Sequence, residues 1–210
     1  MPLGEEPILE IIVKQLVARG FDHITMAVNH QAEIIKAFFG DGRKWKVKID
    51  YSLEEKPLGT MAPLKAIKDL PENFLVMNGD VLTDRDYGEF HQLHVKSGEI
   101  FTISSARRTQ AIDYGVLRVD ESGTLTGFQE KPKTSYLVSM GVYMLNRCVL
   151  DFIPEDVAFG FDNLMYKLLE AGEKVSVSVY EGLWLDIGRP DDYHEAIDLY
   201  ENNRPTILGL

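Results

Sequence analysis

The stretch NFLVMNGDVLTD, residues 73–84, decides the fold class. Residues 74–77 form a continuous apolar run of the kind that is buried on both faces of a parallel sheet. Asp84 then offers an N-cap for a helix that we expect to reach about Lys96, and residues 100–105 predict a further strand. A strand, a helix and another strand in this order are typical of a doubly wound α/β layer.

The elements around this stretch continue the alternation. Apolar residues at helical spacing predict a first helix over 8–17, with Pro7 in its first turn. After Arg108 the rhythm changes, and the segments YGVLRVD and TLTGFQEK predict an antiparallel hairpin. The other strands are expected over 24–28, 47–51, 136–145 and 174–180, and the other helices over 30–39, 61–68, 162–170 and 190–200.

These elements predict an α/β fold with a doubly wound, mostly parallel, Rossmann-like sheet and a β-hairpin insertion. We expect residues 1–210 to form a single domain, since the chain carries no repeat, linker or low-complexity stretch. The chain opens in a helix, without a preceding strand and without a G-x-G or Walker pattern. We therefore expect the first strand of the sheet, with its phosphate-binding turn, to be absent.

Composition excludes several classes of protein. With 45% hydrophobic and 26% charged residues, the chain is neither disordered nor coiled coil. No apolar run approaches eighteen residues and the start is no signal peptide, so we expect a cytoplasmic protein without a membrane partner. The single cysteine, Cys148, excludes an internal disulfide. A net charge of −11 repels phosphate backbones, and we expect no nucleic-acid partner despite the basic run from Arg43 to Lys48, which has the pattern of the outer face of a strand.

Two aspartates are candidate ligands for a metal ion. Asp80 follows the strand at 74–77, where open α/β sheets bind their ligands, and Asp186 lies in LWLDIGRP between a strand and the last helix. Magnesium prefers one or two carboxylates together with substrate phosphates. We expect the two carboxylates to converge, although either could instead cap a turn or a helix.

Three shorter motifs admit two interpretations each. Asp84-Arg85-Asp86 has the D-x-D spacing of metal-dependent glycosyltransferases, but its place at a helix start favours capping. Glu130-Lys131 offers an acceptor for sugar hydroxyls and a charge for a phosphate, or else a solvated strand edge. Both side chains reach one ligand only if the strand ends or bends there, which the next residue, a proline, favours. Gly59-Thr60 suits a flat ligand close to the backbone, or a plain turn.

Taken in order, these motifs resemble sugar-phosphate nucleotidyltransferases, the nucleoside-diphosphate-sugar pyrophosphorylases. The resemblance rests on seven blocks across nearly the whole chain: PILE, KPLGT, NGDVLTD, YGV, FQEKP, GVY and WLDIGRPDDY. It implies the fold of nucleotide-diphospho-sugar transferases, and the joining of a nucleoside triphosphate to a sugar 1-phosphate, with Mg²⁺ and with release of pyrophosphate. It further implies roles for these residues: Asp80 and Asp186 as catalytic metal ligands, Gly59 and Thr60 at the nucleotide, and Tyr114, Gly115, Glu130, Lys131 and Ser139 at the sugar phosphate.

The chain departs from the family pattern at its start. The glycine-rich turn G-G-x-G-T-R-L, which cradles the triphosphate, would lie upstream of Met1, and we expect no measurable turnover without it. Two alternatives stay open: a non-catalytic relative that binds a sugar phosphate, and a metal-dependent glycosyltransferase. The base and the sugar stay open as well. An unpaired sheet edge left by the absent strand favours association, so a homo-oligomer is among the expected states.

Overall fold

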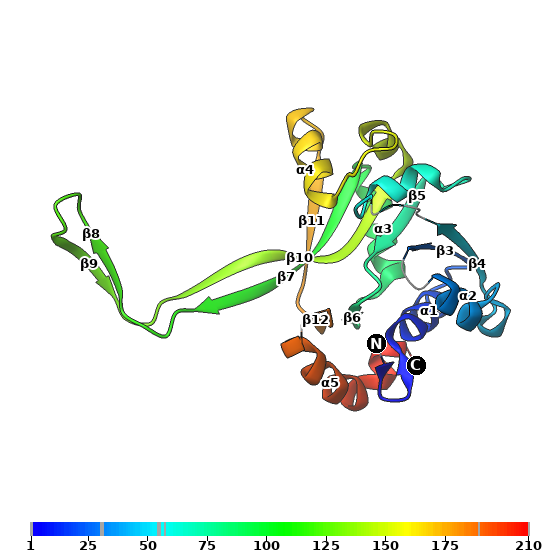
Figure 1. Cartoon of the computed structure of the whole chain (residues 1–210), viewed down its shortest axis with the longest axis horizontal. Helices are drawn as coiled ribbons and strands as arrows, with labels where there is room; N and C mark the ends of the chain where they lie inside the picture. The colour runs from blue at the N-terminus through cyan, green and yellow to red at the C-terminus, as the bar shows by residue number, and fades with distance from the viewer. Residues whose placement is uncertain (1, 30–31, 54–55, 57, 189, 210) are drawn as a thin grey trace.

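The computed structural model describes residues 2–29, 32–53, 56, 58–188 and 190–209 (Figure 1). The α-helices are α1 (Ile8–Ala18), α2 (Ala32–Phe39), α3 (Tyr87–Ser97), α4 (Phe161–Glu170) and α5 (Pro190–Leu208), and the 3-10 helices are η1 (Arg43–Trp45), η2 (Ala62–Ala66) and η3 (Arg147–Phe152). The strands are β1 (Pro2–Leu3), β2 (Glu6–Pro7), β3 (His23–Val28), β4 (Lys48–Leu53), β5 (Asn73–Met77), β6 (Val81–Thr83), β7 (Phe101–Ala111), β8 (Val116–Val119), β9 (Leu125–Gln129), β10 (Lys133–Asn146), β11 (Val175–Tyr180) and β12 (Trp184–Asp186).

The central sheet is mixed and has the strand order β11-β7-β10-β5. β11 lies parallel to β7, whereas β10 runs antiparallel to both β7 and β5. The α/β class is confirmed. The Rossmann-like sheet is confirmed as well, since β5, β7 and β11 run in the same direction. Only β10 is reversed, because it returns from the hairpin that follows β7 and a hairpin reverses the direction of the chain. For the same reason β5 has an antiparallel neighbour and not a parallel one.

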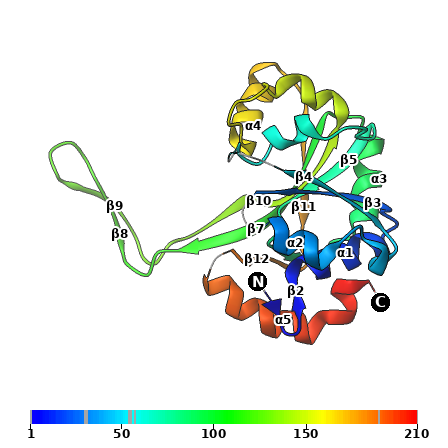
Figure 2. The same ribbon diagram turned by 45° about the vertical axis from the view of Figure 1, so that its right-hand side comes forward.

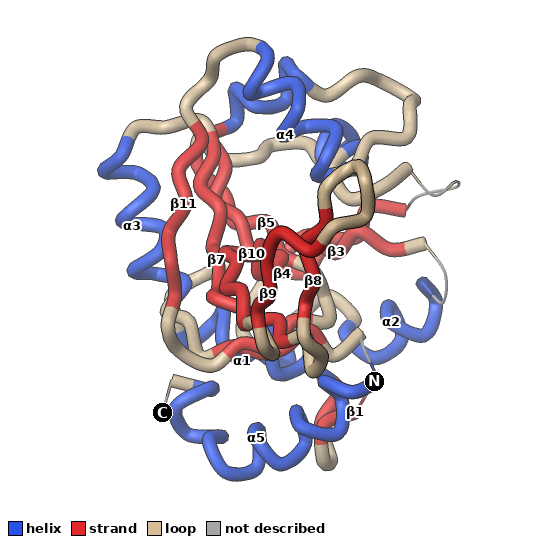
Figure 3. The backbone as a smooth tube through the Cα atoms, turned by 90° about the vertical axis from the view of Figure 1, so that its left-hand side faces the viewer, coloured by secondary structure: helices blue, strands red, loops and turns tan. Residues whose placement is uncertain are grey.

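Helices cover both faces of this sheet (Figures 2 and 3). On one face α4 and η2 pack against the strands, and Phe101, Leu145 and Leu164 are fully buried there. On the opposite face α1, α3 and α5 contribute to a second cluster that includes Phe90 and Met144. None of the helices in the described part of the chain combines the length and the apolarity needed to cross a membrane.

One edge of the sheet has no neighbouring strand among the described residues. Asn78 donates a backbone hydrogen bond to Gly141, and the register places the even-numbered residues of β5 in hydrogen-bonded pairs with β10. The backbone groups of Leu75 and Met77 therefore point to the other edge. β3 and β4 form a separate parallel pair, and the only strands described ahead of α1 are the two-residue strands β1 and β2, which pair with each other.

Three local expectations from the sequence are wrong. The first part of the basic run, from Arg43, forms η1 and only Lys48 lies in a strand, because left-handed residues flank η1 at Gly42 (φ 86°) and Lys46 (φ 59°) and turn the chain. The helix expected over 61–68 is only the 3-10 helix η2. Asp86, and not Asp84, caps α3, and its side chain accepts a hydrogen bond from the Glu89 N–H at 3.0 Å.

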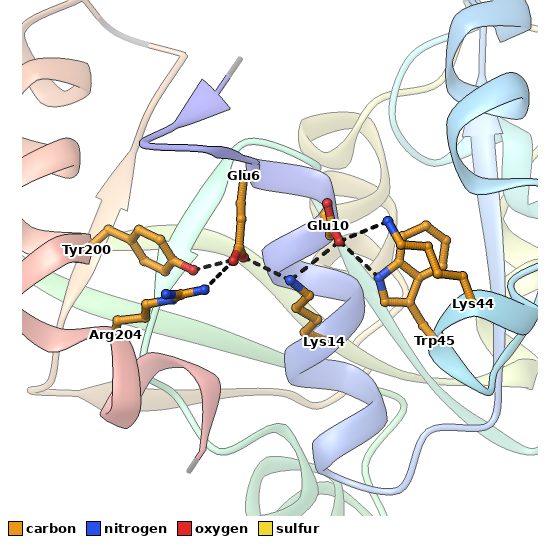
Figure 4. Close-up of polar contacts among 7 residues, drawn as sticks. All are labelled: Glu6, Glu10, Lys14, Lys44, Trp45, Tyr200 and Arg204. Carbon is orange, nitrogen blue, oxygen red and sulfur yellow. Dashed lines mark hydrogen bonds and ion pairs between the residues drawn. The ribbon is translucent and has the colours of Figure 1, made fainter.

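A charged network joins the N-terminal segment to α5 (Figure 4). The Glu6 carboxylate accepts hydrogen bonds from Lys14 Nζ at 3.0 Å and Tyr200 Oη at 3.1 Å, and it also pairs with Arg204. Glu10, one helical turn later, accepts from Trp45 Nε1 at 3.2 Å. These contacts attach η1 and α5 to opposite sides of α1.

The expected hairpin insertion is a long two-stranded arm, which we define as residues 107–137. The outer part of β7 pairs with the outer part of β10, and β8 pairs with β9 at the tip. Figures 1 and 2 show the arm projecting far from the rest of the chain, which we call the body. Most of the arm's residues are exposed.

Candidate functional site

Two carboxylates from distant parts of the sequence lie next to each other at the end of the short β6-β12 ladder. Asp80 directly precedes β6, and Asp186 ends β12 opposite Val81. The Ile187 N–H also donates to the backbone oxygen of Asp80 at 3.0 Å. The structure thus brings Asp80 and Asp186 together, through an antiparallel pair of strands and not through neighbouring parallel strands.

Gly188 keeps the space between these carboxylates open. A Cβ atom at this position would lie 2.9 Å from Asp80 Oδ2 and 3.2 Å from Asp186 Oδ1, so any side chain there would contact both. The Gly188 N–H donates to Asp186 Oδ1 at 3.2 Å. Gly188 is not among the site residues predicted from the sequence, although a glycine two residues after an acidic strand end is the signal that could have found it.

The electrostatics of the pair favour a cation. Burial, followed by the negative charge of Asp186, raises the pKa of Asp80 above its usual range. A divalent cation would offset both the unfavourable burial of the Asp80 charge and its repulsion by Asp186. Two carboxylates also fit the donor set of Mg²⁺, which completes its coordination with water and substrate phosphates. Within the described residues no group of three or more His, Cys, Asp or Glu side chains could form an all-protein metal cage.

The Asp84-Arg85-Asp86 motif serves the structure of the body. Asp84 Oδ1 accepts hydrogen bonds from Tyr180 Oη at 2.6 Å and the Leu183 N–H at 2.7 Å, which hold the β11-β12 connection. Arg85 is buried, and its guanidinium lies 4.2 Å from the Phe90 ring centroid. With Asp86 at the cap of α3, all three side chains have contacts within the body.

Ser139 lies where the arm joins the body, close to the chain that carries Asp80. Its hydroxyl donates to Tyr143 Oη at 3.0 Å and accepts from the Gly141 N–H at 3.2 Å. The register of β10 shifts between Ser139 and Tyr143, which marks a bulge. Gly141, with φ +73°, lies in this bulge, and a Cβ atom there would be 2.8 Å from Asn78 Nδ2. The bulge thus connects Ser139 to the loop that leads to Asp80.

Gly59 and Thr60 belong to a loop on the side of the core cluster under α4, beside the start of that helix. Gly59 has φ +84°, and a Cβ atom there would lie 2.9 Å from the backbone oxygen of Phe159. The Thr60 hydroxyl accepts a hydrogen bond from the Phe161 N–H at 3.1 Å. Both residues therefore support the packing of this loop, and neither is joined to the carboxylate pair by a contact on the described part of the chain.

The remaining sugar-phosphate candidates gather at the bend of the arm, between the β7-β10 ribbon and the β8-β9 hairpin. A Cβ atom at Gly115 would lie 3.2 Å from Glu130 Oε2, so the YGV and EKP blocks face each other across the hairpin. β9 ends at Gln129, and Lys131 adopts φ +41°, so the strand does end and turn at Glu130-Lys131. Tyr114 is 79% exposed. Within one chain this cluster lies far from β6 and β12 (Figure 1).

Curated proteins of similar sequence catalyse nucleotidyl transfer to sugar phosphates. The chain is 32% identical to a UTP–glucose-1-phosphate uridylyltransferase of Synechocystis and 32% identical to mannose-1-phosphate guanylyltransferase 1 of Arabidopsis thaliana, with 94% of this chain covered in both. It spans only 56% and 57% of the length of these relatives. A D-glycero-alpha-D-manno-heptose 1-phosphate guanylyltransferase of Campylobacter jejuni is 30% identical, and the chain covers 87% of its length.

Solved structures share the fold. HddC from Yersinia pseudotuberculosis superposes with a TM-score of 0.72 at 22% identity, over 95% of this chain and 88% of that one. The Bacillus anthracis protein described as a putative glucose-1-phosphate thymidylyltransferase gives the same TM-score at 18% identity, over 95% of this chain and 84% of that one. The family model for nucleotidyl transferases matches residues 1–203. The chain therefore belongs to the nucleotidyl transferase family.

Proposed function

We propose that this protein transfers a nucleotidyl group from a nucleoside triphosphate to a sugar 1-phosphate. The observation that carries the proposal is the Asp80-Asp186 pair around Gly188, in a chain of the nucleotidyl transferase family. In this reaction an oxygen of the sugar phosphate attacks the α-phosphorus, and the bond from that phosphorus to the departing pyrophosphate breaks. The protein has to align these groups and offset their charge.

We assign the metal to the carboxylate pair. Asp80 and Asp186 would hold Mg²⁺, which when bound neutralises phosphate charge that two bare carboxylates would repel. Gly188 leaves room beside both side chains. We place the reaction in the cytoplasm, where nucleoside triphosphates and sugar phosphates are available.

The resemblance supplies the roles of the remaining residues. Glu130 would accept hydrogen bonds from sugar hydroxyls, and Lys131 would meet the sugar phosphate as a point charge. Tyr114, Gly115 and Ser139 would line the same subsite. Gly59 and Thr60 would lie against the nucleotide base, in addition to their contacts with the loop before α4.

We propose GTP as the nucleotide and a mannose or heptose 1-phosphate as the acceptor. Support comes from the curated relatives, since the Campylobacter protein, of whose length this chain covers 87%, is named as a heptose 1-phosphate guanylyltransferase. The Arabidopsis relative uses mannose 1-phosphate with the same nucleotidyl group. UTP with glucose 1-phosphate is the competing pair, because it is named for the Synechocystis relative.

The test is a pyrophosphate-release assay with these nucleotides, these sugar phosphates and Mg²⁺. We expect turnover from an extended chain, to which the glycine-rich turn of the family is added ahead of Met1, and a loss of about a hundred- to a thousand-fold in Asp186→Asn. Asp198→Asn, an exposed carboxylate on α5, is the matched control and keeps full activity. The 210-residue chain is measured beside the extended one, and robust turnover by residues 1–210 would contradict the expected need for the glycine-rich turn.

The same assay separates the alternatives. A non-catalytic relative would bind a sugar phosphate without releasing pyrophosphate in either form of the chain. A glycosyltransferase would consume a nucleotide sugar and depend on the D-x-D motif, but the contacts of Asp84, Arg85 and Asp86 within the body argue against that role.

A further inference from the structure

Apart from the contact of Arg108 with the Trp184 ring at its base, no described element covers the arm on either side. Beyond Arg107 and Leu137 it is a two-stranded ribbon, and at the tip β8 and β9 pair with no third strand among the described residues. A two-stranded hairpin is at best marginally stable in water unless a third strand or another layer packs on it. Its projection from the body means that the described body does not supply that layer (Figures 1 and 2).

One face of the hairpin is apolar and exposed. Leu117 pairs with Phe128, and Val119 pairs with Leu125, so the four side chains lie on the same face. Their exposed fractions are 62%, 61%, 60% and 57% respectively. The other face carries Arg118, Gln129 and the half-buried Val116. An exposed apolar face is the pattern of a sheet that packs against a core on that side, and an exposed patch of this kind marks an interaction surface.

The body has an open apolar sheet face next to the site. Val177 and Val179 of β11 are 51% and 44% exposed. Val179 pairs with Ser105, which pairs with Ser139, so these side chains share one face of the sheet with the proposed sugar subsite. The cluster under α4 covers the same face only at the other end of β11, around Val175, Phe101 and Leu145.

Charge and area both point to a second copy of this chain. The arm carries 5 Lys+Arg and 4 Asp+Glu, a net +1, whereas the rest of the chain carries 17 and 29, a net −12. An arm is therefore attracted to a body, while two bodies repel each other. An arm about 30 Å long and about 10 Å wide, docked reciprocally in a two-fold pair, would bury roughly 1,200 Å² in total, which meets the lower limit for a stable interface.

We propose that the arm is a dimerisation element that docks on the body of a second copy. Its apolar hairpin face covers the partner's open sheet face, and the turn at Glu130-Lys131 reaches the partner's carboxylate pair. The second half of this proposal rests on the proposed function. It resolves the separation, within one chain, between the sugar-phosphate candidates on the arm and the carboxylates in the body.

Sedimentation equilibrium tests the docking without any substrate. We expect the wild-type protein to have twice the mass of the 23.8 kDa chain. The double variant Leu117→Ser/Phe128→Ser should raise the dimer dissociation constant by about a hundred-fold or more, and Val177→Ser/Val179→Ser on the receiving face should weaken the dimer as well. Tyr166→Ser/Leu169→Ser, two exposed side chains of α4, is the matched control and keeps the wild-type mass. A monomeric wild type, or a dimer that either test variant leaves intact, would overturn the proposal.

A mixing experiment tests whether the arm completes the partner's site. Lys131→Ala and Asp186→Asn are each inactive in the extended protein, but their heterodimer has one site with both intact residues. An equal mixture should therefore recover about a quarter of wild-type activity, and no recovery would place Lys131 with the carboxylates of its own chain. If the unmixed wild type neither turns over nor binds a nucleotide sugar, the proposed function fails, while the sedimentation result still decides the docking.

Discussion

The body and the arm place the same kinds of side chain in opposite environments. Phe101 and Leu145 of the central sheet are fully buried, whereas Leu117 and Phe128 of the hairpin are more than half exposed. All four lie in strands with suitable neighbours, so strand propensity does not distinguish them. The difference is that α4 and η2 cover the first pair, and nothing in the described body covers the second pair. Alternating apolar and polar residues predict that one face of a strand has to be buried, but they do not predict whether the same chain or a partner buries it.

A single strand crosses from one environment to the other. In β10 the residues at 133–137 are exposed, and those at 140–145 are buried. The bulge at Gly141 lies at this change. β10 therefore connects the arm directly to Ser139, and a docked arm would affect the site through this strand.

The largest effect should come from truncating a ring in the body. Phe101→Ala removes a fully buried side chain that lies 5.5 Å from the Tyr143 ring centroid, and it should lower the free energy of unfolding by about 3 to 5 kcal/mol. Phe128→Ala on the arm should change the free energy of unfolding of the monomer by less than about 0.5 kcal/mol. Urea unfolding at low protein concentration measures both. Equal losses would mean that the arm folds against its own body.

Gly141→Ala should break the junction between the two regions. A side chain at φ +73° is strained, and its Cβ would also lie 2.8 Å from Asn78 Nδ2, so we expect a loss of about 1 to 3 kcal/mol. Gly172→Ala is the matched control, because its φ is +72° but no atom lies within 4 Å. The control measures the effect of the backbone strain alone, and the additional loss of stability in Gly141→Ala measures the effect of the clash with Asn78. If both variants lose the same amount in urea unfolding, the close approach to Asn78 has no energetic weight.

A smaller loss is expected at the charged network that binds α5 to the body. Burial alone would raise the pKa of Glu6, but hydrogen bonds from Lys14 and Tyr200, with the charges of Lys14 and Arg204, lower it. Glu6→Gln should therefore cost about 1 to 2 kcal/mol at neutral pH. Because a lowered pKa stabilises the folded state only while the group is ionised, the difference from wild type should shrink between about pH 5 and pH 2.

Unfolding curves across this pH range provide the measurement. The control is Glu33→Gln, since the Glu33 side chain is 89% exposed beside Lys36 and should contribute almost nothing. A loss at Glu6 that persists unchanged at low pH would show that packing, and not the charge, holds α5.

How much the sequence predicts differs between the two regions. In the body, the apolar run at 74–77 and the periodic pattern of α1 identify the elements, because local pattern and burial agree. The direction of β10 is missed, since strand direction depends on how the preceding hairpin folds back. The sequence also assigns the cap of α3 to Asp84 and not to Asp86, because two aspartates two residues apart are equivalent until Tyr180 and the Leu183 N–H bind the first.

The candidate site divides along the same boundary. The approach of Asp80 to Asp186 can be predicted, because each lies next to a strand end on the ligand side of the fold, although the strands that join them are the antiparallel β6 and β12. The position of Glu130 and Lys131 cannot, because it depends on where a 31-residue ribbon points after it leaves the sheet. A ribbon of two strands carries no covering layer that would fix its direction from sequence alone.

The smallest effect concerns the carboxylate pair, and its sign opposes that of Glu6. Burial and the charge of Asp186 raise the pKa of Asp80, so its ionised form costs the folded state stability at neutral pH. That cost is relieved as the pH falls through the raised pKa, and it vanishes below about pH 4, where the unfolded chain is protonated too. Asp80→Asn should therefore stabilise the protein at pH 7 by less than about 1 kcal/mol, since water screens a partly exposed pair.

Thermal unfolding with and without Mg²⁺ measures this change in stability, with Asp198→Asn as the control. Mg²⁺ should raise the midpoint of the wild type and of the control, but not that of Asp80→Asn. If Asp80→Asn is less stable than the wild type at pH 7, Asp80 stabilises the β6-β12 ladder. That result would contradict a role in which Asp80 binds a cation and lowers the stability of the metal-free protein.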